Sequence, residues 1–358
     1  MNARDRIRVL VIDDSAYSRR TIIRMLETSP WIEVVDWARD GEEALRKALE
    51  TPLDLITLDL EMPRMDGFTF LRLLMARRPT PVLVVSGRTG DQDVFRALEL
   101  GAVDFLAKPT DHAAPELATI ERELVRKVHA IRQLRIEKVQ EGIALAPTPT
   151  RSWAGADGLP RVVAIGSSTG GPTALLRLFE AFSEAPPFAC VVSQHMPEGF
   201  TAGFARRLDR YTVFAAREAC CGDALEPGTI LLAPGGSHLE FESQRGRVLS
   251  RVVARNDGDK YAPSVDRMFG SAAKHFGPDL MAVVLTGMGD DGSRGARLVR
   301  QCGGRVIAES EETAVIFGMP QQAIRARAVD SVLPLTEIAP AIQAGLRRAD
   351  ETQEEGTP

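Results

Sequence analysis

The chain has 358 residues, of which 44% are hydrophobic and 26% are charged, and its formal net charge is −5. This length favours two domains that each bury a core, and the composition is ordinary for a globular protein. With 44 basic against 49 acidic residues and no strongly basic block, we do not expect nucleic-acid binding. No apolar stretch reaches the roughly 18–20 residues of a membrane span, and the first apolar run is too short for a signal peptide.

The four cysteines form no C-x-x-C pair, which disfavours a zinc site. Cys220 and Cys221 are adjacent, and an ordinary disulfide between neighbours would be strained. We therefore expect a reducing compartment, the cytoplasm. Since no apolar stretch is long enough to span a bilayer, we also expect no insertion into a membrane.

Residues 1–127 alternate short β-rich runs with helical patterns. This alternation predicts a doubly wound, five-stranded parallel sheet in an α/β domain. In such a sheet, functional residues lie at the carboxyl ends of the strands. The expected strands are 7–12, 32–35, 55–58, 82–85 and 103–106.

Three carboxylates follow two of these strands. Asp13 and Asp14 come directly after the first strand, and Asp59 comes directly after the third. Carboxylates clustered at one sheet edge repel one another unless a hard divalent cation bridges them, and Mg²⁺ takes oxygen ligands. The sequence therefore predicts a magnesium site formed by Asp13, Asp14 and Asp59.

A hydroxyl and an ammonium group are expected at the same edge. Ser86 ends the fourth strand and Lys108 follows the fifth. Both can bind the oxygens of a phosphoryl group on Asp59. Each polar residue alone could merely cap a strand or a helix, but five of them at strand ends favour one common site.

Residues 7–127 resemble the receiver domain of response regulators. The matching text is Asp13-Asp14-Ser15, LDLEMPRMDG at 58–67, Ser86 and Lys108-Pro109. The receiver family by itself does not specify an output. The resemblance gives each matching residue a role: Asp59 is the phosphoacceptor, Asp13 and Asp14 carry Mg²⁺, Ser86 and Lys108 bind the phosphoryl group, and Phe105 takes the aromatic switch position.

Residues 128–158 are expected to form a linker between two domains. A charged extension of the fifth receiver helix is followed by APTPT at 146–150 and by two glycines. Proline and small polar residues cannot bury much surface, so this segment is read as a tether. The acidic stretch 349–358 reads as a frayed tail.

The strand–helix rhythm resumes over residues 159–348 and predicts a second α/β domain. Its sheet is expected to be mostly parallel, with an antiparallel hairpin over 241–253. The expected buried strands are 162–165, 189–192, 230–233, 281–285 and 306–308.

A G-x-S-x-G pattern at residues 166–170 follows the first of these strands, with Ser168 at its centre. A sharp strand-to-helix turn exposes the serine hydroxyl to a base and lets backbone N–H groups hold an oxyanion. Ser167 is an adjacent alternative nucleophile, and the turn could instead bind phosphate at the helix N-terminus. The absence of a G-x-G-x-x-G pattern and of a P-loop lysine argues against phosphate.

A serine nucleophile needs a base, usually a histidine oriented by a carboxylate. His195 directly follows a strand, so we prefer it to His238, at a turn, and to His275, in a helix. Asp290 and Asp291 follow another strand in a glycine-rich turn, and spacing does not choose between them. The order serine, histidine, acid differs from that of α/β-hydrolases and indicates a convergent triad.

The chain as a whole resembles the chemotaxis protein-glutamate methylesterases of the CheB type. By this resemblance Ser168 is the nucleophile, His195 the base and Asp291 the orienting acid. Serine at 167, where alanine is common, is a small departure. The matching segments are IGSSTGG at 165–171, QHMP at 194–197, PSVD at 263–266 and LTGMGDDG at 285–292.

The resemblance implies a hydrolase that removes methyl esters from glutamate side chains of methyl-accepting chemoreceptors, and some relatives also deamidate receptor glutamines. A chemotaxis histidine kinase would phosphorylate Asp59 with Mg²⁺ as cofactor, whereas the esterase reaction needs none. The receiver would act as a reversible cover over the catalytic crevice, so that phosphorylation activates the enzyme.

Two other functions make different predictions. A receiver with a binding-only output predicts a basic recognition helix or a degraded triad. A lipase-like esterase for small molecules predicts the order serine, acid, histidine. The sequence matches neither.

Overall fold

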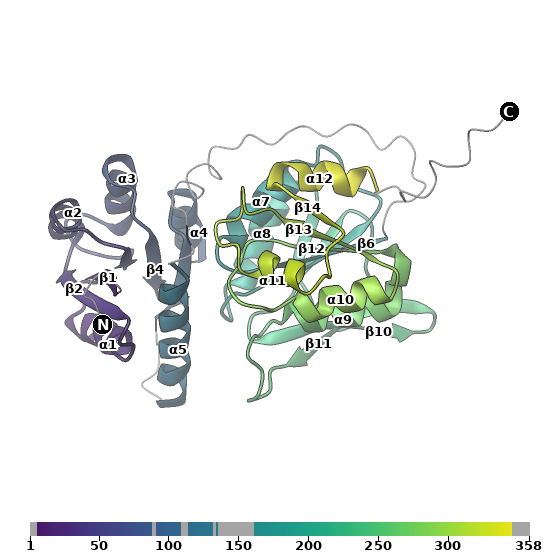
Figure 1. Cartoon of the computed structure of the whole chain (residues 1–358), viewed down its shortest axis with the longest axis horizontal. Helices are drawn as coiled ribbons and strands as arrows, with labels where there is room; N and C mark the ends of the chain where they lie inside the picture. Colours follow the sequence, from purple (N-terminus) through teal and green to yellow (C-terminus); the bar gives the residue numbers. More distant parts are fainter. Residues whose placement is uncertain (1–5, 88–90, 109–113, 132–133, 135–160, 346–358) are drawn as a thin grey trace. The chain divides into compact units, whose positions relative to one another are not determined.

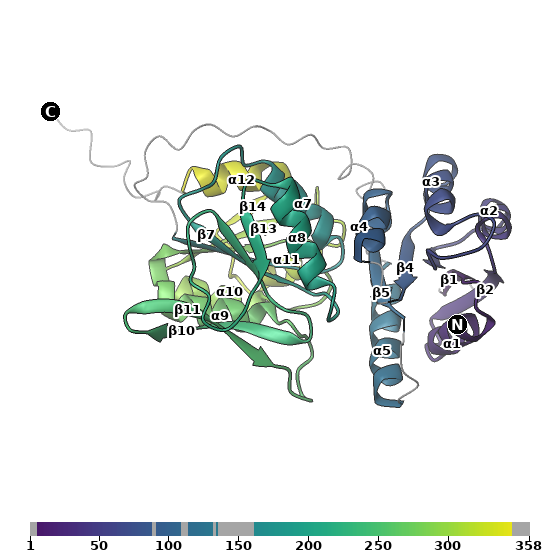
Figure 2. The same ribbon diagram turned by 180° about the vertical axis from the view of Figure 1, so that it is seen from behind.

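The structure is a computed structural model that describes residues 6–87, 91–108, 114–131, 134 and 161–345 (Figures 1 and 2). The chain divides into two compact units, Met1–Leu145 and Ala146–Pro358. Most of the predicted linker and the whole predicted tail at 349–358 lie outside the described residues. Within the described part, no helix is both long and apolar enough to cross a lipid bilayer.

The first unit contains a five-stranded parallel sheet in the order β2-β1-β3-β4-β5. Strands β1 and β3 are almost entirely buried because helices cover both faces of the sheet, which confirms the predicted doubly wound domain. Its elements are β1 (Ile7–Ile12), α1 (Ala16–Glu27), β2 (Ile32–Ala38), α2 (Gly41–Glu50), β3 (Leu55–Leu58), α3 (Gly67–Arg77), β4 (Val82–Ser86), α4 (Asp91–Glu99), β5 (Asp104–Ala107) and α5 (Ala114–Ala130).

Polar side chains fix where helices of the first unit begin. Ser15, Asp40 and Asp66 each stand at an N-cap with extended backbone, and each accepts a hydrogen bond from the amide three residues ahead. These bonds satisfy amides that lack a partner inside the helix. The turn between β1 and α1 is therefore short, which keeps Asp13 and Asp14 at the sheet edge.

The second unit is built on a seven-stranded parallel sheet in the order β14-β13-β12-β6-β7-β9-β8. A separate antiparallel pair, β10 and β11, forms the predicted hairpin. The strands are β6 (Val162–Ser167), β7 (Ala189–Gln194), β8 (Ala215–Glu218), β9 (Thr229–Leu232), β10 (Ser237–Gln244), β11 (Arg247–Ala254), β12 (Leu280–Val284), β13 (Arg305–Glu309) and β14 (Ser331–Leu333).

Helices α7, α8 and α12 lie on one side of this sheet, and α9, α10 and α11 lie on the other, with the hairpin packed against α9 (Figures 1 and 2). The core residues of β6, β7 and β12 are buried from both sides, as their unbroken apolar runs predict. The helices are α7 (Gly171–Glu180), α8 (Thr201–Tyr211), α9 (Val265–Phe276), α10 (Ser293–Gln301), α11 (Met319–Arg325) and α12 (Leu335–Gln343), with a short 3₁₀ helix at Gly277–Asp279.

Strand β6 lies between β12 and β7. After β6 the chain adds β7, β8 and β9 on one side of it and then β12, β13 and β14 on the other. In an open parallel sheet, such a reversal of strand order opens a crevice at the carboxyl ends of the strands. The segments that carry Ser168, His195 and Asp291 follow β6, β7 and β12 at this point. The fold therefore brings three distant segments of sequence to one edge.

Candidate functional site

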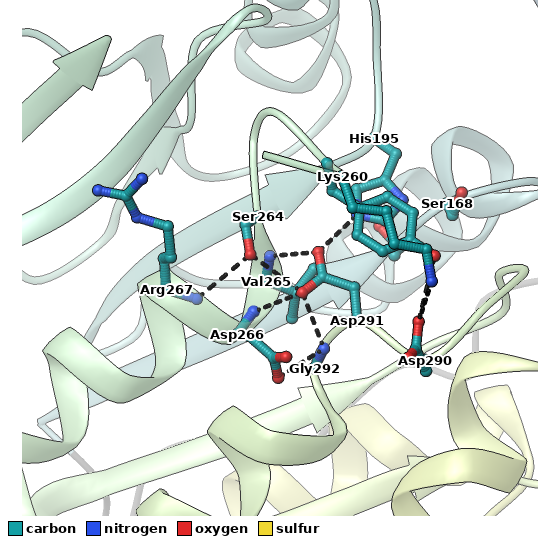
Figure 3. A network of polar contacts seen from close by, with 12 residues as sticks. Ser168, His195, Lys260, Ser264, Val265, Asp266, Arg267, Asp290, Asp291 and Gly292 are labelled. Atoms are coloured by element: carbon teal, nitrogen blue, oxygen red, sulfur yellow. Dashed lines mark hydrogen bonds and ion pairs between the residues drawn. The ribbon is translucent and has the colours of Figure 1, made fainter. Parts of the chain in front are cut away.

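Ser168 lies in the turn that joins β6 to α7 (Figure 3). Its amide donates to the carbonyl of Thr286 at 3.0 Å, and its own carbonyl accepts from the amide of Gly171 at 2.8 Å. Gly170 has a φ of +78°, a backbone conformation that glycine adopts without steric cost, and it is the N-cap residue of α7. These contacts hold the turn in a single tight conformation.

The prediction that the Ser168 hydroxyl is exposed is wrong for this structure, because the residue is only 3% exposed. The turn after β12 closes over it. A Cβ atom added at Gly287 would lie 2.8 Å from the Cβ of Ser168 and 2.4 Å from the sulfur of Met319. Glycine at 287 is thus what allows the two turns to approach each other.

His195 follows β7 and pairs with Asp291, which follows β12: Nε2 of the imidazole lies 2.8 Å from Oδ2 of the carboxylate (Figure 3). The amide of His195 donates to the carbonyl of Ser167 at 3.0 Å, so its backbone runs beside the serine turn. Both side chains are buried. Nδ1 of His195 is also buried and accepts or donates no hydrogen bond within the described part of the chain.

Asp291 is held by the start of α9. It accepts hydrogen bonds from the amides of Val265 at 2.7 Å and Asp266 at 2.8 Å, and from the hydroxyl of Ser264 at 3.0 Å (Figure 3). Burial alone would raise the pKa of Asp291, but the hydrogen bond and charge of His195 and the two amides outweigh it and lower the pKa. The carboxylate therefore stays ionised beside the imidazole.

The neighbouring Asp290 points elsewhere. Its Oδ1 lies 2.7 Å from Nζ of Lys260 and 3.3 Å from the hydroxyl of Tyr261, and its side chain is 61% exposed (Figure 3). The structure thus brings Asp291, and not Asp290, to His195, a choice that sequence spacing left open.

The other candidate side chains have other partners. Ser167 is fully buried and donates to Oε1 of Gln194 at 2.7 Å. His238 lies in β10 rather than at a turn, and its Nε2 is 2.9 Å from Asp259. His275, in α9, contacts the carbonyl of Phe241 at 3.0 Å. These contacts tie together the hairpin, α9 and the segment between them.

Gln194 is a buried residue of this site to which the sequence analysis gave no role. Its amide group donates at 2.9 Å both to the carbonyl of Ser168 and to that of His195. It therefore ties the turn after β6 to the turn after β7. The signal was present in the sequence, because Gln194 belongs to the matching segment QHMP, but a side chain that binds backbone carbonyls and one serine hydroxyl leaves no chemical pattern to recognise.

In the first unit, Asp13, Asp14 and Asp59 each offer a carboxylate oxygen within 4.8 Å of the others. Asp13 and Asp59 are buried and Asp14 is exposed. Lys108 forms an ion pair with Oδ2 of Asp59, and its Nζ also lies 3.0 Å from Oδ2 of Asp13. Ser86 ends β4 at the same edge of the sheet, and Phe105 is buried in β5.

Burial dominates the electrostatics of these carboxylates. It raises the pKa of both Asp13 and Asp59 even though Lys108 acts in the opposite direction. Burial would lower the pKa of Lys108, but its two carboxylate partners raise it. Among the described residues, the buried Oδ2 of Asp13 has the Lys108 ammonium group as its charged partner. Three clustered oxygen donors, with buried charge that one ammonium group only partly offsets, fit a hard divalent cation such as Mg²⁺.

Comparison with known proteins decides the family. The sequence profile of the CheB methylesterase family matches residues 163–342, and that of the response regulator receiver domain matches residues 9–118. A protein-glutamate methylesterase/protein-glutamine glutaminase of Geobacter sulfurreducens is 48% identical over 355 residues, which cover 93% of this chain and 96% of the relative. The chain belongs to the CheB methylesterase family.

Further comparisons agree with this assignment. A protein-glutamate methylesterase/protein-glutamine glutaminase of Myxococcus xanthus is 48% identical over 348 residues, which cover 97% of this chain and 99% of the relative. The crystal structure of the Thermotoga maritima CheB methylesterase catalytic domain has a TM-score of 0.50 and 39% identity, and covers 52% of this chain and 98% of that one. The predicted family, hydrolase class and fold class are confirmed.

Proposed function

We propose that this chain hydrolyses methyl esters on glutamate side chains of methyl-accepting chemoreceptors, in the cytoplasm, and that the same site deamidates receptor glutamines. The names of the relatives join the two activities. Both reactions are acyl transfers, with methanol leaving in one and ammonia in the other. The observation that carries the proposal is the buried pair of His195 and Asp291 beside the Ser168 turn.

In this proposal the Ser168 hydroxyl attacks the ester carbonyl and His195 takes its proton. Nε2 is bound to Asp291, so the proton goes to Nδ1. The ionised Asp291 holds the imidazole in this tautomer and stabilises the imidazolium. The imidazolium then protonates the leaving group, and a water molecule activated by Nδ1 hydrolyses the acyl-serine to free the glutamate carboxylate.

The negative charge on the carbonyl oxygen needs hydrogen-bond donors in the transition state. Helix α7 begins three residues after Ser168, so its N-terminus, the positive end of the helix dipole, is beside the nucleophile. We assign stabilisation of the oxyanion to the backbone N–H groups of this turn and helix start. Burial of Ser168 strengthens such interactions because it excludes water.

The same proposal gives the receiver unit control of the reaction rate. A chemotaxis histidine kinase phosphorylates Asp59, and Asp13, Asp14 and Asp59 would hold Mg²⁺, which when bound neutralises the clustered oxygens. Lys108 exchanges its carboxylate partner for a phosphoryl oxygen, Ser86 binds another, and buried Phe105 responds as the aromatic switch. The added charge and the redirected Lys108 bias the domain toward its activating state.

Methanol release from methylated receptor membranes tests the activity, and ammonia release from receptors that carry glutamine tests the second reaction. Both products should appear with the parent chain, and both should vanish together in Ser168→Ala because they share one nucleophile. Loss of methanol with full retention of ammonia would show that the deamidase reaction does not use this site.

A further inference from the structure

The ring of Tyr261 lies flat on the ring of the proposed base. The two ring centroids of Tyr261 and His195 are 4.5 Å apart, and the ring planes differ by only 9°. Tyr261 belongs to the loop that joins β11 to α9, and it has no place in the triad chemistry. A stacked contact of this kind fixes the plane of the imidazole, which its single hydrogen bond to Asp291 leaves free to tilt.

The loop is fastened beside the active site on both sides of the tyrosine. Lys260 forms an ion pair with Asp290 at 2.7 Å (Figure 3), and the Tyr261 hydroxyl donates to the same carboxylate oxygen at 3.3 Å. Nζ of Lys260 also lies 4.9 Å from the centre of the Tyr261 ring. Asp290 does not contact His195 itself, but it binds Tyr261, whose ring lies over the imidazole.

The backbone leaves room for the tyrosine at one specific glycine. Gly289 has a φ of +95°, and a Cβ atom there would lie 2.3 Å from the Tyr261 hydroxyl oxygen. Any side chain at this position would push the ring away from His195 and would also strain the backbone. The turn after β12 thus supplies Asp291 to one edge of the imidazole and space for Tyr261 over its face.

The root of the loop is anchored as well. The carboxylate of Asp259 accepts from the amide of Asn256 at 2.8 Å, lies 2.9 Å from Nε2 of the fully buried His238, and is 3.5 Å from Arg267 in α9. Tyr261 is two residues from this anchor. The stacked arrangement is therefore held in place before any substrate arrives, which is the condition for a positioning role.

We propose that Tyr261 is a positioning residue of the esterase: it stacks on His195 and keeps Nδ1 directed at the nucleophile. The face of a phenol ring carries partial negative charge, so the same contact favours the imidazolium that forms when His195 takes the serine proton. This inference rests on the proposed roles of Ser168 and His195.

The test compares Tyr261→Phe, Tyr261→Leu and Tyr261→Ala in the full-length chain. Phenylalanine keeps the stacked ring and loses only the hydroxyl, whereas leucine keeps bulk without a flat ring. Tyr211→Ala is the matched control, because Tyr211 is an exposed tyrosine of α8 that stacks with arginines. Thermal unfolding of each variant establishes that it is folded.

Two readouts are measured. The first is kcat and KM for methanol release from methylated receptor membranes. The second is the rate at which a fluorophosphonate labels Ser168: the serine oxygen bonds to phosphorus, the P–F bond breaks, fluoride leaves and His195 takes the proton. The label needs no receptor, so it reports the activation of the serine separately from substrate binding.

We expect Tyr261→Ala and Tyr261→Leu to lower kcat and the labelling rate by roughly 10- to 100-fold with KM little changed, since misplacing a catalytic group by about 1 Å can cost about 100-fold. The kcat and labelling rate of Tyr261→Phe should remain within about threefold of the parent, because the stacked ring is kept. Tyr211→Ala should stay within the same range, because it changes only an exposed side chain of α8.

Labelling of folded Tyr261→Ala as fast as the parent would overturn the inference, and so would a loss confined to KM, which would make Tyr261 a substrate contact. A parent chain that the probe does not label at Ser168 would instead overturn the proposed nucleophile, and the inference with it.

Discussion

Nε2 of His195 lies 2.8 Å from Oδ2 of Asp291, so the carboxylate binds the ring nitrogen farther from the main chain. In the serine protease triad the aspartate binds Nδ1 and the serine faces Nε2. The reversed pairing leaves Nδ1 of His195, buried and without a hydrogen-bond partner in the described structure, as the nitrogen that can accept a proton. In the proposed mechanism, His195 would therefore use the ring nitrogen nearest its own backbone as the base.

The two adjacent serines should differ sharply on substitution. Ser168→Ala should lower the rate of methanol release by roughly 10⁴- to 10⁶-fold, because members of a triad act as a unit. Ser167→Ala removes only the hydrogen bond to Gln194 and should cost far less. Initial rates on methylated receptor membranes measure both, and a larger loss in Ser167→Ala would move the nucleophile by one residue.

The two adjacent aspartates provide a second matched pair. Asp291→Asn keeps the shape but loses the charge that holds the imidazole tautomer, and should reduce kcat by about 10⁴-fold as in other triads. Asp290→Asn leaves the contact between His195 and Asp291 intact and weakens only the contacts with Lys260 and Tyr261, so it should cost far less than Asp291→Asn. Comparable losses in kcat for the two variants would argue against Asp291 as the orienting acid.

Asp291 should also affect stability in acid. Its pKa is lowered in the folded protein, so its stabilising contribution is present above the unfolded pKa of about 3.9 and is lost as pH falls through the folded pKa. Asp291→Asn should therefore unfold at a lower temperature than the parent at pH 7, and the gap should narrow below about pH 4. Calorimetric scans at pH 7 and below pH 4 measure the difference in unfolding temperature between the two proteins. A difference that grows in acid would contradict a lowered pKa for Asp291.

Receiver chemistry should depend on one carboxylate. A small acyl phosphate donor should label the parent chain on Asp59, and Asp59→Asn should remove the label. Asp36→Asn, which alters a receiver aspartate paired with Lys47, should be labelled normally. Intact-mass measurement detects the phosphoryl group, and a label that persists in Asp59→Asn would place the phosphoacceptor elsewhere.

The same labelling should require Mg²⁺. A chelator should abolish it, and Asp13→Asn should raise the Mg²⁺ concentration needed by at least about tenfold, because even indirect partners of a metal ligand are typically worth 10- to 100-fold in affinity. A titration of labelling rate against Mg²⁺ gives the comparison. Identical titration curves for the parent and Asp13→Asn would remove Asp13 from the metal site.

Sequence reasoning recovered the elements whose patterns are continuous. Strands such as β6 and β12 are unbroken apolar runs, and the rule that functional residues follow strands selected His195 correctly as the histidine that meets Asp291. Edge strands β8 and β14 were missed, because Ala-Ala-Arg-Glu and Ser-Val-Leu are short and only partly buried. Such strands are defined by pairing with a neighbour, which sequence does not display.

Three features of the site required tertiary information. Asp290 and Asp291 share one glycine-rich turn, and only the amides at the start of α9 show which carboxylate is drawn inward. Tyr261 lies in an irregular loop without periodicity, and its contact with His195 joins segments that are far apart in the sequence. Burial of Ser168 likewise depends on the approach of a second turn at Gly287.

The most direct test of the account is methanol release from methylated receptor membranes, measured with and without a small phosphodonor in the presence of Mg²⁺. The parent chain should release methanol, and the phosphodonor should increase the rate. Ser168→Ala should release almost none under either condition, and Asp59→Asn should release methanol at a rate that the phosphodonor does not change. Methanol release that persists in Ser168→Ala, or a parent chain that releases none, would contradict the account.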